Sequence, residues 1–179
     1  MFDFGSKWTP AAPLADDAIE ADGLAIAFRS GMSLCLVSGD VSAALSRLGL
    51  GARALGITDA AEAADYALAI ARDRCLVVTQ MSRDVPEGWS DAGFCITDVT
   101  DGYVAVELAG PALQAILSQA TTLDWTQPSR SAAIQFSGVT AYGSWASRGV
   151  ARLFIETPMA PYLRAWLDLA SRSTGASLR

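Results

Sequence analysis

Two aspartates, Asp98 and Asp101, stand three residues apart and form the acidic pair in this sequence whose spacing is best suited to chemistry. The first lies in a predicted strand over 94–99, and the second lies in the turn behind it. Carboxylates in such a position could hold a metal ion or contact a substrate. Asp101 stands directly before Gly102, and Asp-Gly is common in tight turns because the carboxylate accepts local hydrogen bonds. We therefore interpret the pair as turn-forming residues.

The residues that usually perform nucleophilic and acid/base catalysis are missing. The chain contains no histidine, and of its 13 basic residues only Lys7 is a lysine. This excludes Ser-His-Asp and Cys-His catalysis and leaves almost no amine for Schiff-base chemistry. No GxSxG sequence occurs, and the glycines of 49–56 follow neither GxGxxG nor GxxxxGK[ST] order. We predict no catalytic, cofactor-binding or metal-binding residue in this chain.

The cysteines are predicted to be structural. Cys35, Cys75 and Cys95 are odd in number, widely spaced and placed in apolar runs. This pattern resembles neither a disulfide framework nor a CxxC metal site. We expect three buried, reduced thiols.

Composition excludes several classes of partner. The net charge is −6 and the pI is about 4.5, so no basic face is expected for nucleic acid. No apolar run approaches the roughly 20 residues that cross a bilayer, and residues 1–10 do not resemble a signal peptide. We expect a cytoplasmic protein with no membrane contact. Hydrophobic residues make up 51% of the chain against 18% charged, an excess that predicts a surface covered by a protein partner.

The first half of the chain is expected to contain an arm, a small lobe and a linker. Residues 1–22, with two prolines and four acids after residue 9, are interpreted as an N-terminal arm. The first lobe, 23–80, is predicted to contain a hairpin of 24–28 with 34–37, a helix over 41–48 and a second hairpin over 65–79. Residues 81–91 carry Pro86, Gly88 and four charges, which favours a linker between lobes.

The second lobe, 92–172, has clearer periodicity. After strands over 94–99 and 104–108, Gly110-Pro111 precedes a helix whose apolar stripe is Leu113, Ile116, Leu117 and Ala120. Residues 134–145 predict one bent strand, or two with a kink at Gly138, and 150–155 predict another. A C-terminal tail is expected over 173–179.

The last helix is expected to begin at Thr157, capped by the threonine hydroxyl and with Pro158 at its first position. Apolar residues then recur at helical spacing and predict a stripe that packs on the sheet, although Tyr162 and Trp166 could instead stack on a flat cofactor. The stripe consists of Met159, Tyr162, Leu163, Trp166 and Ala170.

A weak internal repeat links the two halves. Residues 35–40 and residues 106–111 both run from strand through glycine into a helix. With strands joined by short turns and helices that cross over them, this predicts an α+β fold of mostly antiparallel sheets arranged as a duplicated, two-lobed domain.

Several stretches of the second half resemble the gamma subunit of heterotetrameric sarcosine oxidase. They are ITDVTDGYVAVELAGP at 96–111, a helix followed by Leu123-Asp124, FSGVT at 136–140, and APYLRAWL at 160–167. The last two are similar to that family's Phe-x-Gly-Val strand and Tyr-Leu-x-x-Trp-Leu terminal helix. The match spans roughly residues 92–170 in the family's order. Where the family usually has Cys-Pro before Leu-Asp, this chain has Thr121-Thr122.

The resemblance implies a fold like the folate-binding domain of glycine-cleavage aminomethyltransferases. It also implies a non-catalytic small subunit of a complex that oxidatively demethylates an N-methyl amine. In that family the alpha subunit carries NAD and tetrahydrofolate, the beta subunit FAD and FMN, and the delta subunit zinc. The resemblance therefore implies alpha, beta and delta partners and no cofactor on this chain.

Two alternatives remain open from the residues themselves. One is a stand-alone tetrahydrofolate-binding one-carbon protein, for which Glu107 or Asp98 would be the mid-chain acids available to hold the pterin. The other is a homodimeric binding module. For the subunit hypothesis, the aromatic residues Phe2, Phe4 and Trp8 of the arm are the predicted partner interface, because such side chains are costly to leave in water.

Overall fold

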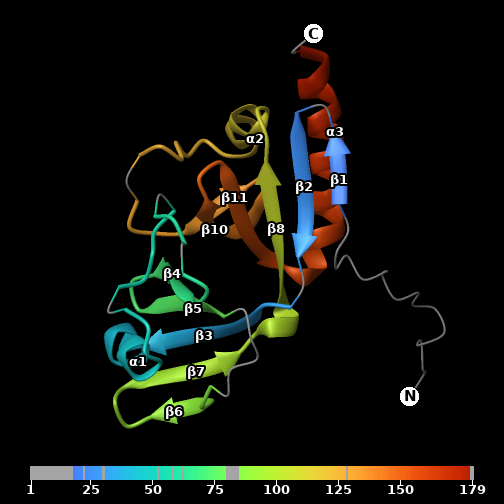
Figure 1. Cartoon of the computed structure of the whole chain (residues 1–179). Helices are drawn as coiled ribbons and strands as arrows, with labels where there is room; N and C mark the ends of the chain where they lie inside the picture. The colour runs from blue at the N-terminus through green and yellow to red at the C-terminus, as the bar shows by residue number, and fades with distance from the viewer. Residues whose placement is uncertain are drawn as a thin grey trace, which may run out of the picture.

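Two antiparallel sheets, with three α-helices on their outer faces, form the described part of the molecule (Figure 1). The computed structural model describes residues 18–21, 23–29, 31–51, 53–57, 59–61, 63–79, 85–127 and 129–177. Sheet A has the order β1 (Ala18–Ala21), β2 (Leu24–Arg29), β8 (Tyr103–Ala109), β11 (Val150–Glu156), β10 (Val139–Ser147), β9 (Ala133–Phe136). Sheet B has the order β4 (Tyr66–Ala71), β5 (Arg74–Thr79), β3 (Ser33–Gly39), β7 (Phe94–Asp98), β6 (Gly88–Ser90). The helices are α1 (Val41–Arg47), α2 (Leu113–Ala120) and α3 (Ala160–Ser177), with short 3₁₀ turns η2 (Thr100–Gly102) and η3 (Thr157–Met159).

The chain contains a structural duplication in which the two copies exchange their first hairpins. Each copy runs hairpin, strand, helix and then a pair of antiparallel strands: β1–β2, β3, α1, β4–β5 in the first, and β6–β7, β8, α2, β10–β11 in the second. The hairpin β1–β2 joins the sheet of β8, whereas β6–β7 joins the sheet of β3. The predicted internal repeat is therefore present, but each sheet contains strands from both predicted lobes, 23–80 and 92–172.

The repeat extends to individual glycines at the start of each helix. Gly39 and Gly110, which precede α1 and α2, have φ angles of 102° and 121°. A Cβ on Gly39 would lie 2.3 Å from the carbonyl oxygen of Gly93, and one on Gly110 would lie 2.4 Å from that of Gly23. Both positions require glycine for two reasons. The backbone has a positive φ angle there, and it lies directly against the turn of the exchanged hairpin, where a side chain has no room.

Three predictions made for the first half need correction. Residues 24–28 and 34–37 do not form a hairpin, because β2 pairs with β1 and β8 while β3 pairs with β5 and β7. The arm predicted over 1–22 includes strand β1, and the linker predicted over 81–91 includes strand β6. Alternation of apolar residues identifies a strand and its buried face, but it does not identify the neighbouring strand.

Several predictions that depend on local chemistry are confirmed. The second hairpin forms from β4 and β5 around Arg72-Asp73. Helix α1 follows Asp40, whose Oδ1 accepts a hydrogen bond of 2.9 Å from the backbone N–H of Ala43. All four residues of the predicted α2 stripe are buried. Strands β9 and β10 are separate and turn at Ser137-Gly138, which is the two-strand alternative.

Helix α3 differs from its prediction in its start, its stripe and its end. The Thr157 hydroxyl donates to the carbonyl oxygen of Asp101 at 2.9 Å rather than capping the helix, and residues 157–159 form η3. Tyr162 is half exposed and donates to the Ser137 carbonyl oxygen. The predicted tail, 173–179, is helical as far as Ser177. Among the residues of α3 whose burial is described, 160–173, those that are buried are Ala160, Leu163, Leu167, Ala170 and Ser171.

The core is layered around the two sheets. One apolar cluster lies between the outer face of sheet A and helices α2 and α3, and a second lies between the outer face of sheet B and α1. A third cluster joins the inner faces of the two sheets and includes Leu34, Leu76, Ala105 and Phe154. This third cluster is formed mainly by β3, β4 and β5 of sheet B and by β8, β10 and β11 of sheet A.

Candidate functional site

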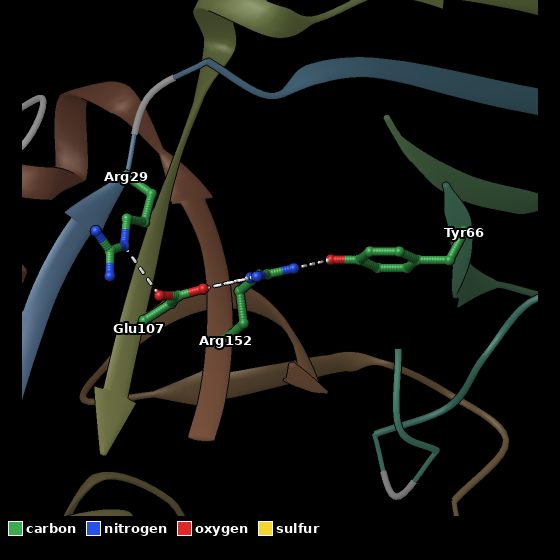
Figure 2. Close-up of polar contacts among 4 residues, drawn as sticks. All are labelled: Arg29, Tyr66, Glu107 and Arg152. Carbon is green, nitrogen blue, oxygen red and sulfur yellow. Dashed lines mark hydrogen bonds and ion pairs between the residues drawn. The ribbon is translucent and has the colours of Figure 1, made fainter. Parts of the chain in front are cut away.

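A polar network enters the space between the sheets at Glu107 (Figure 2). Glu107 lies on β8 between Val106 and Leu108, which face the helices, so its own side chain points toward sheet B. Its direct neighbour on β11 is Arg152. The Glu107 carboxylate accepts from Arg152 Nη2 at 2.6 Å and Nε at 3.0 Å through Oε1.

Two further residues complete the network. Arg29 Nε, on β2, donates to Glu107 Oε2 at 2.9 Å. On the other side Arg152 Nη1 donates to the Tyr66 hydroxyl at 2.9 Å, and this residue comes from β4 of the opposite sheet. The chain of contacts therefore links β2, β8 and β11 of sheet A to sheet B.

Glu107 is held in its ionised form. Burial raises its pKa, but hydrogen bonds and charge from Arg152 and then Arg29 outweigh burial, so the pKa lies below the ordinary value. Burial raises the pKa of Tyr66, although the Arg152 guanidinium opposes the shift. Both carboxylate oxygens accept hydrogen bonds from guanidinium groups, so Glu107 is committed to this network and orients Arg152, which reaches sheet B.

An acidic pocket lies where the chain crosses from sheet B to sheet A. It has a volume of about 620 Å³ and is lined by Glu87, Asp98, Val99, Thr100, Asp101, Gly102, Tyr103, Glu156 and Pro158. The predicted pair of aspartates is thus brought together with Glu87 and Glu156. Among the described residues, the lining contains four carboxylates and neither arginine nor lysine. The pocket suits a positively charged group.

The local geometry of Asp98 is that of a turn. Its Oδ1 accepts from the backbone N–H of Thr100 at 2.8 Å, and Thr100 Oγ1 accepts from the backbone N–H of Leu34 at 3.0 Å. Hydrogen bonds from the Thr100 hydroxyl and backbone N–H lower the pKa of Asp98. Its carboxylate is therefore charged near neutral pH, which makes it a poor general acid. Across the described residues, no group of three or more His, Cys, Asp or Glu could hold a metal ion.

A second cavity of about 620 Å³ opens beside the β10–β11 hairpin and is lined by Ala60, Trp145, Ala146, Ser147, Arg148 and Gly149. Trp145 meets the ring of Trp125 edge-on at 5.5 Å and packs against the core of sheet A. Trp166 likewise meets Phe136 edge-on at 6.0 Å. These aromatic rings pack with other aromatic rings, in agreement with the core interpretation of the α3 stripe for Trp166.

The cysteine prediction is right for two residues and wrong for the third. Cys35 and Cys75 are buried thiols, and burial raises the pKa of Cys75 to about 12. Cys95 is only partly buried. It lies on β7 between Phe94 and Ile96, which face α1, so its side chain points to the opposite face of sheet B.

That opposite face carries a surface that sequence reasoning missed. Sheet A packs on the part of this face formed by β4, β5 and Leu34, whereas toward β7 and β6 the residues are partly buried or exposed. We call the open part the β6 shelf; it consists of Leu36, Trp89, Cys95 and Thr97. Trp89 is 72% exposed. The only signal in the sequence was a tryptophan between two small residues inside the supposed linker.

The predicted interface residues Phe2, Phe4 and Trp8 lie outside the described residues, so their role stays a prediction. No helix in the described ranges is both long enough and apolar enough to cross a membrane.

The fold is that of a chain in a heterotetrameric oxidase. A solved structure, heterotetrameric sarcosine oxidase from Corynebacterium sp. U-96 in complex with pyrrole 2-carboxylate, contains a chain that matches with a TM-score of 0.72. The match has 15% sequence identity and covers 88% of this chain and 89% of that chain. No family model matches the sequence, and no curated protein does. The resemblance to a sarcosine oxidase subunit is therefore confirmed at the level of the fold.

Proposed function

We propose that this chain is a non-catalytic small subunit, equivalent to the gamma subunit, of a sarcosine oxidase-like heterotetramer. The complex would oxidatively demethylate an N-methyl amine and pass the one-carbon unit to tetrahydrofolate on a partner subunit. The partners would be alpha, beta and delta subunits, and these would bind FAD, FMN, NAD, tetrahydrofolate and zinc.

The observation that carries the proposal is the extent of the structural likeness. The match covers nearly equal shares of both chains, so the matching chain is of nearly the same length as this one. A chain of 179 residues that lacks histidine is suited to a supporting role beside larger catalytic subunits. The sequence motifs at 96–111 and 160–167 support the same subunit and were identified without the structure. They also favour the aminomethyltransferase-like, folate-binding type of fold.

The chemistry of the sites supports a supporting subunit over a stand-alone folate-binding protein. Glu107 would have to hold the pterin in the second case, but both its oxygens accept hydrogen bonds from arginines. Asp98 is committed to the turn at Thr100. The acidic pocket around Asp98 would also repel the glutamate carboxylates of a folate.

The test is reconstitution from one bacterial host. This chain, carrying an affinity tag, is co-expressed with candidate flavin-, NAD- and zinc-binding subunits from the same organism. The mass of the purified assembly is measured by native mass spectrometry. We expect a 1:1:1:1 complex that produces hydrogen peroxide with sarcosine or a related N-methyl amine. Omitting this chain should reduce the yield or stability of the complex.

Two results would contradict the proposal. The first is a tagged chain that purifies alone in the presence of all candidate subunits. The second is calorimetric binding of tetrahydrofolate to the isolated chain at micromolar concentration, which would favour the one-carbon alternative.

A further inference from the structure

The β6 shelf combines an exposed tryptophan with an open sheet face. Trp89 pairs directly with Cys95 across β6 and β7, so the two side chains share the inner face of sheet B. Thr97 lies two residues after Cys95 on β7 and pairs with Leu36 of β3, so these two residues lie on the same face. A tryptophan left 72% exposed on such a face is characteristic of a side chain that anchors a protein interface.

The internal duplication supplies a reference for this position. In the exchanged hairpin of sheet A, Glu20 pairs with Ala25 across β1 and β2, as Trp89 pairs with Cys95 across β6 and β7. The equivalent uncovered face of sheet A therefore carries a charge where sheet B carries an indole. The fold itself does not require an aromatic residue here, because the first repeat builds the same hairpin with an exposed glutamate.

The acidic pocket borders the shelf. Glu87, two residues before Trp89, lines this pocket, and Asp98 of the pocket ends strand β7 of the shelf. Asp91, in the turn between β6 and β7, is also exposed. Carboxylates therefore flank the indole at both ends of β6, and the part of the pocket lining that the structure describes holds no positive charge. A partner that complements this surface must be basic around an apolar centre.

We propose that the β6 shelf and the acidic pocket together dock a larger protein subunit, one that receives the indole of Trp89 in an apolar pocket bordered by arginine or lysine residues. This rests on the proposed function, which supplies the larger subunits. The indole would determine how long the complex lasts, and the carboxylates would steer and orient the encounter.

The experiment measures binding of this chain to the co-purified partner subunits prepared without it, by biolayer interferometry at low and at moderate salt. Trp89→Ser is compared with Leu169→Ser, which removes another exposed apolar side chain, 70% exposed on α3. The pocket double variant carries Glu87→Lys and Glu156→Lys. It is compared with a control double variant, Glu20→Lys with Asp73→Lys, which reverses two charges outside the pocket. Circular dichroism checks that each variant has the melting temperature of the wild-type chain.

We expect Trp89→Ser to raise Kd about tenfold or more, mainly through faster dissociation, while Leu169→Ser has little effect. The pocket double variant should lower the association rate about tenfold at low salt and remove most of its salt dependence. The control double variant should stay near wild type.

Three results would overturn the inference. If the wild-type chain assembles and Trp89→Ser binds as tightly, the shelf is not the docking site, although the proposed function stands. If the wild-type chain binds no partner subunit, the proposed function and this inference both fail. If the isolated chain is a dimer that Trp89→Ser converts to a monomer, the shelf binds a second copy of this chain instead.

Discussion

Replacing Glu107 with alanine tests whether the network between the sheets stabilises the fold. The Glu107 and Arg152 side chains are 16% and 10% exposed, whereas Arg29 is 51% exposed. Glu107→Ala leaves the Arg152 guanidinium buried with only the Tyr66 hydroxyl as a partner. Removing one member of a buried pair costs about 3 to 5 kcal/mol, and an exposed partner contributes about 0 to 1 kcal/mol. Because Glu107 retains some contact with solvent, we expect Glu107→Ala to lower the free energy of unfolding by about 3 kcal/mol. Arg29→Ala should lower it by about 0.5 kcal/mol.

Urea unfolding at pH 7, followed by tryptophan fluorescence and by circular dichroism, measures both values. The midpoint should fall for Glu107→Ala with no change in the m-value. For a domain of this size a loss of about 3 kcal/mol corresponds to a fall in melting temperature of roughly 6 to 12 °C.

The difference in the free energy of unfolding between wild type and Glu107→Ala should also depend on pH. The pKa of Glu107 in the folded protein lies below its ordinary value of 4.5. The stabilisation is therefore complete above the pKa of the unfolded chain and is lost as the pH falls through the folded pKa. The two unfolding curves should converge in acid.

Equal losses for Glu107→Ala and Arg29→Ala, or a difference between Glu107→Ala and wild type that persists unchanged at pH 3, would refute this reasoning. The first result would mean that burial does not decide the strength of these contacts, and the second would mean that the carboxylate contributes through packing and not through its charge. A Glu107→Gln variant separates these causes, since it keeps the volume and one acceptor but loses the charge.

Three further predictions concern reactivity, backbone and assembly. In the native protein Cys95 should react first with a thiol reagent at pH 8 and Cys75 should resist, because burial raises the Cys75 pKa to about 12; equal rates would contradict the assigned burial. Gly39→Ala should lower the free energy of unfolding in chemical denaturation by more than about 1 kcal/mol, because a Cβ would meet the Gly93 carbonyl. Gly51→Ala is the control and should be nearly neutral, because nothing lies within 4 Å of a Cβ there. Deleting residues 1–9, which include the predicted interface aromatics, should weaken co-purification with the partner subunits and leave the melting temperature of the isolated chain unchanged; a fall of several degrees with normal assembly would make the arm structural.

The candidate sites were only partly visible in the sequence. The spacing of Asp98 and Asp101 identified a turn rich in carboxylates, and the structure adds Glu87 and Glu156 from distant elements. Nothing in the sequence connects Glu107 with Tyr66, because their contact through Arg152 depends on how the two sheets face each other. The exposure of Trp89 depends on where sheet A stops covering sheet B, and this is a property of the packed molecule.

By itself, the sequence determined several features that depend on short-range chemistry. These are the hairpin around Arg72-Asp73, the helices that follow Gly39 and Gly110, the buried stripe of α2 and the absence of catalytic histidine. The turn residues and apolar periodicity of these segments act over a few residues, so they can be identified without knowledge of the fold. The tertiary structure decided the exchange of hairpins between sheets, because alternating apolar residues make a strand equally suited to several neighbours. The pairing of β2 with β8 and of β7 with β3 joins residues far apart in the sequence, and local periodicity does not encode such contacts.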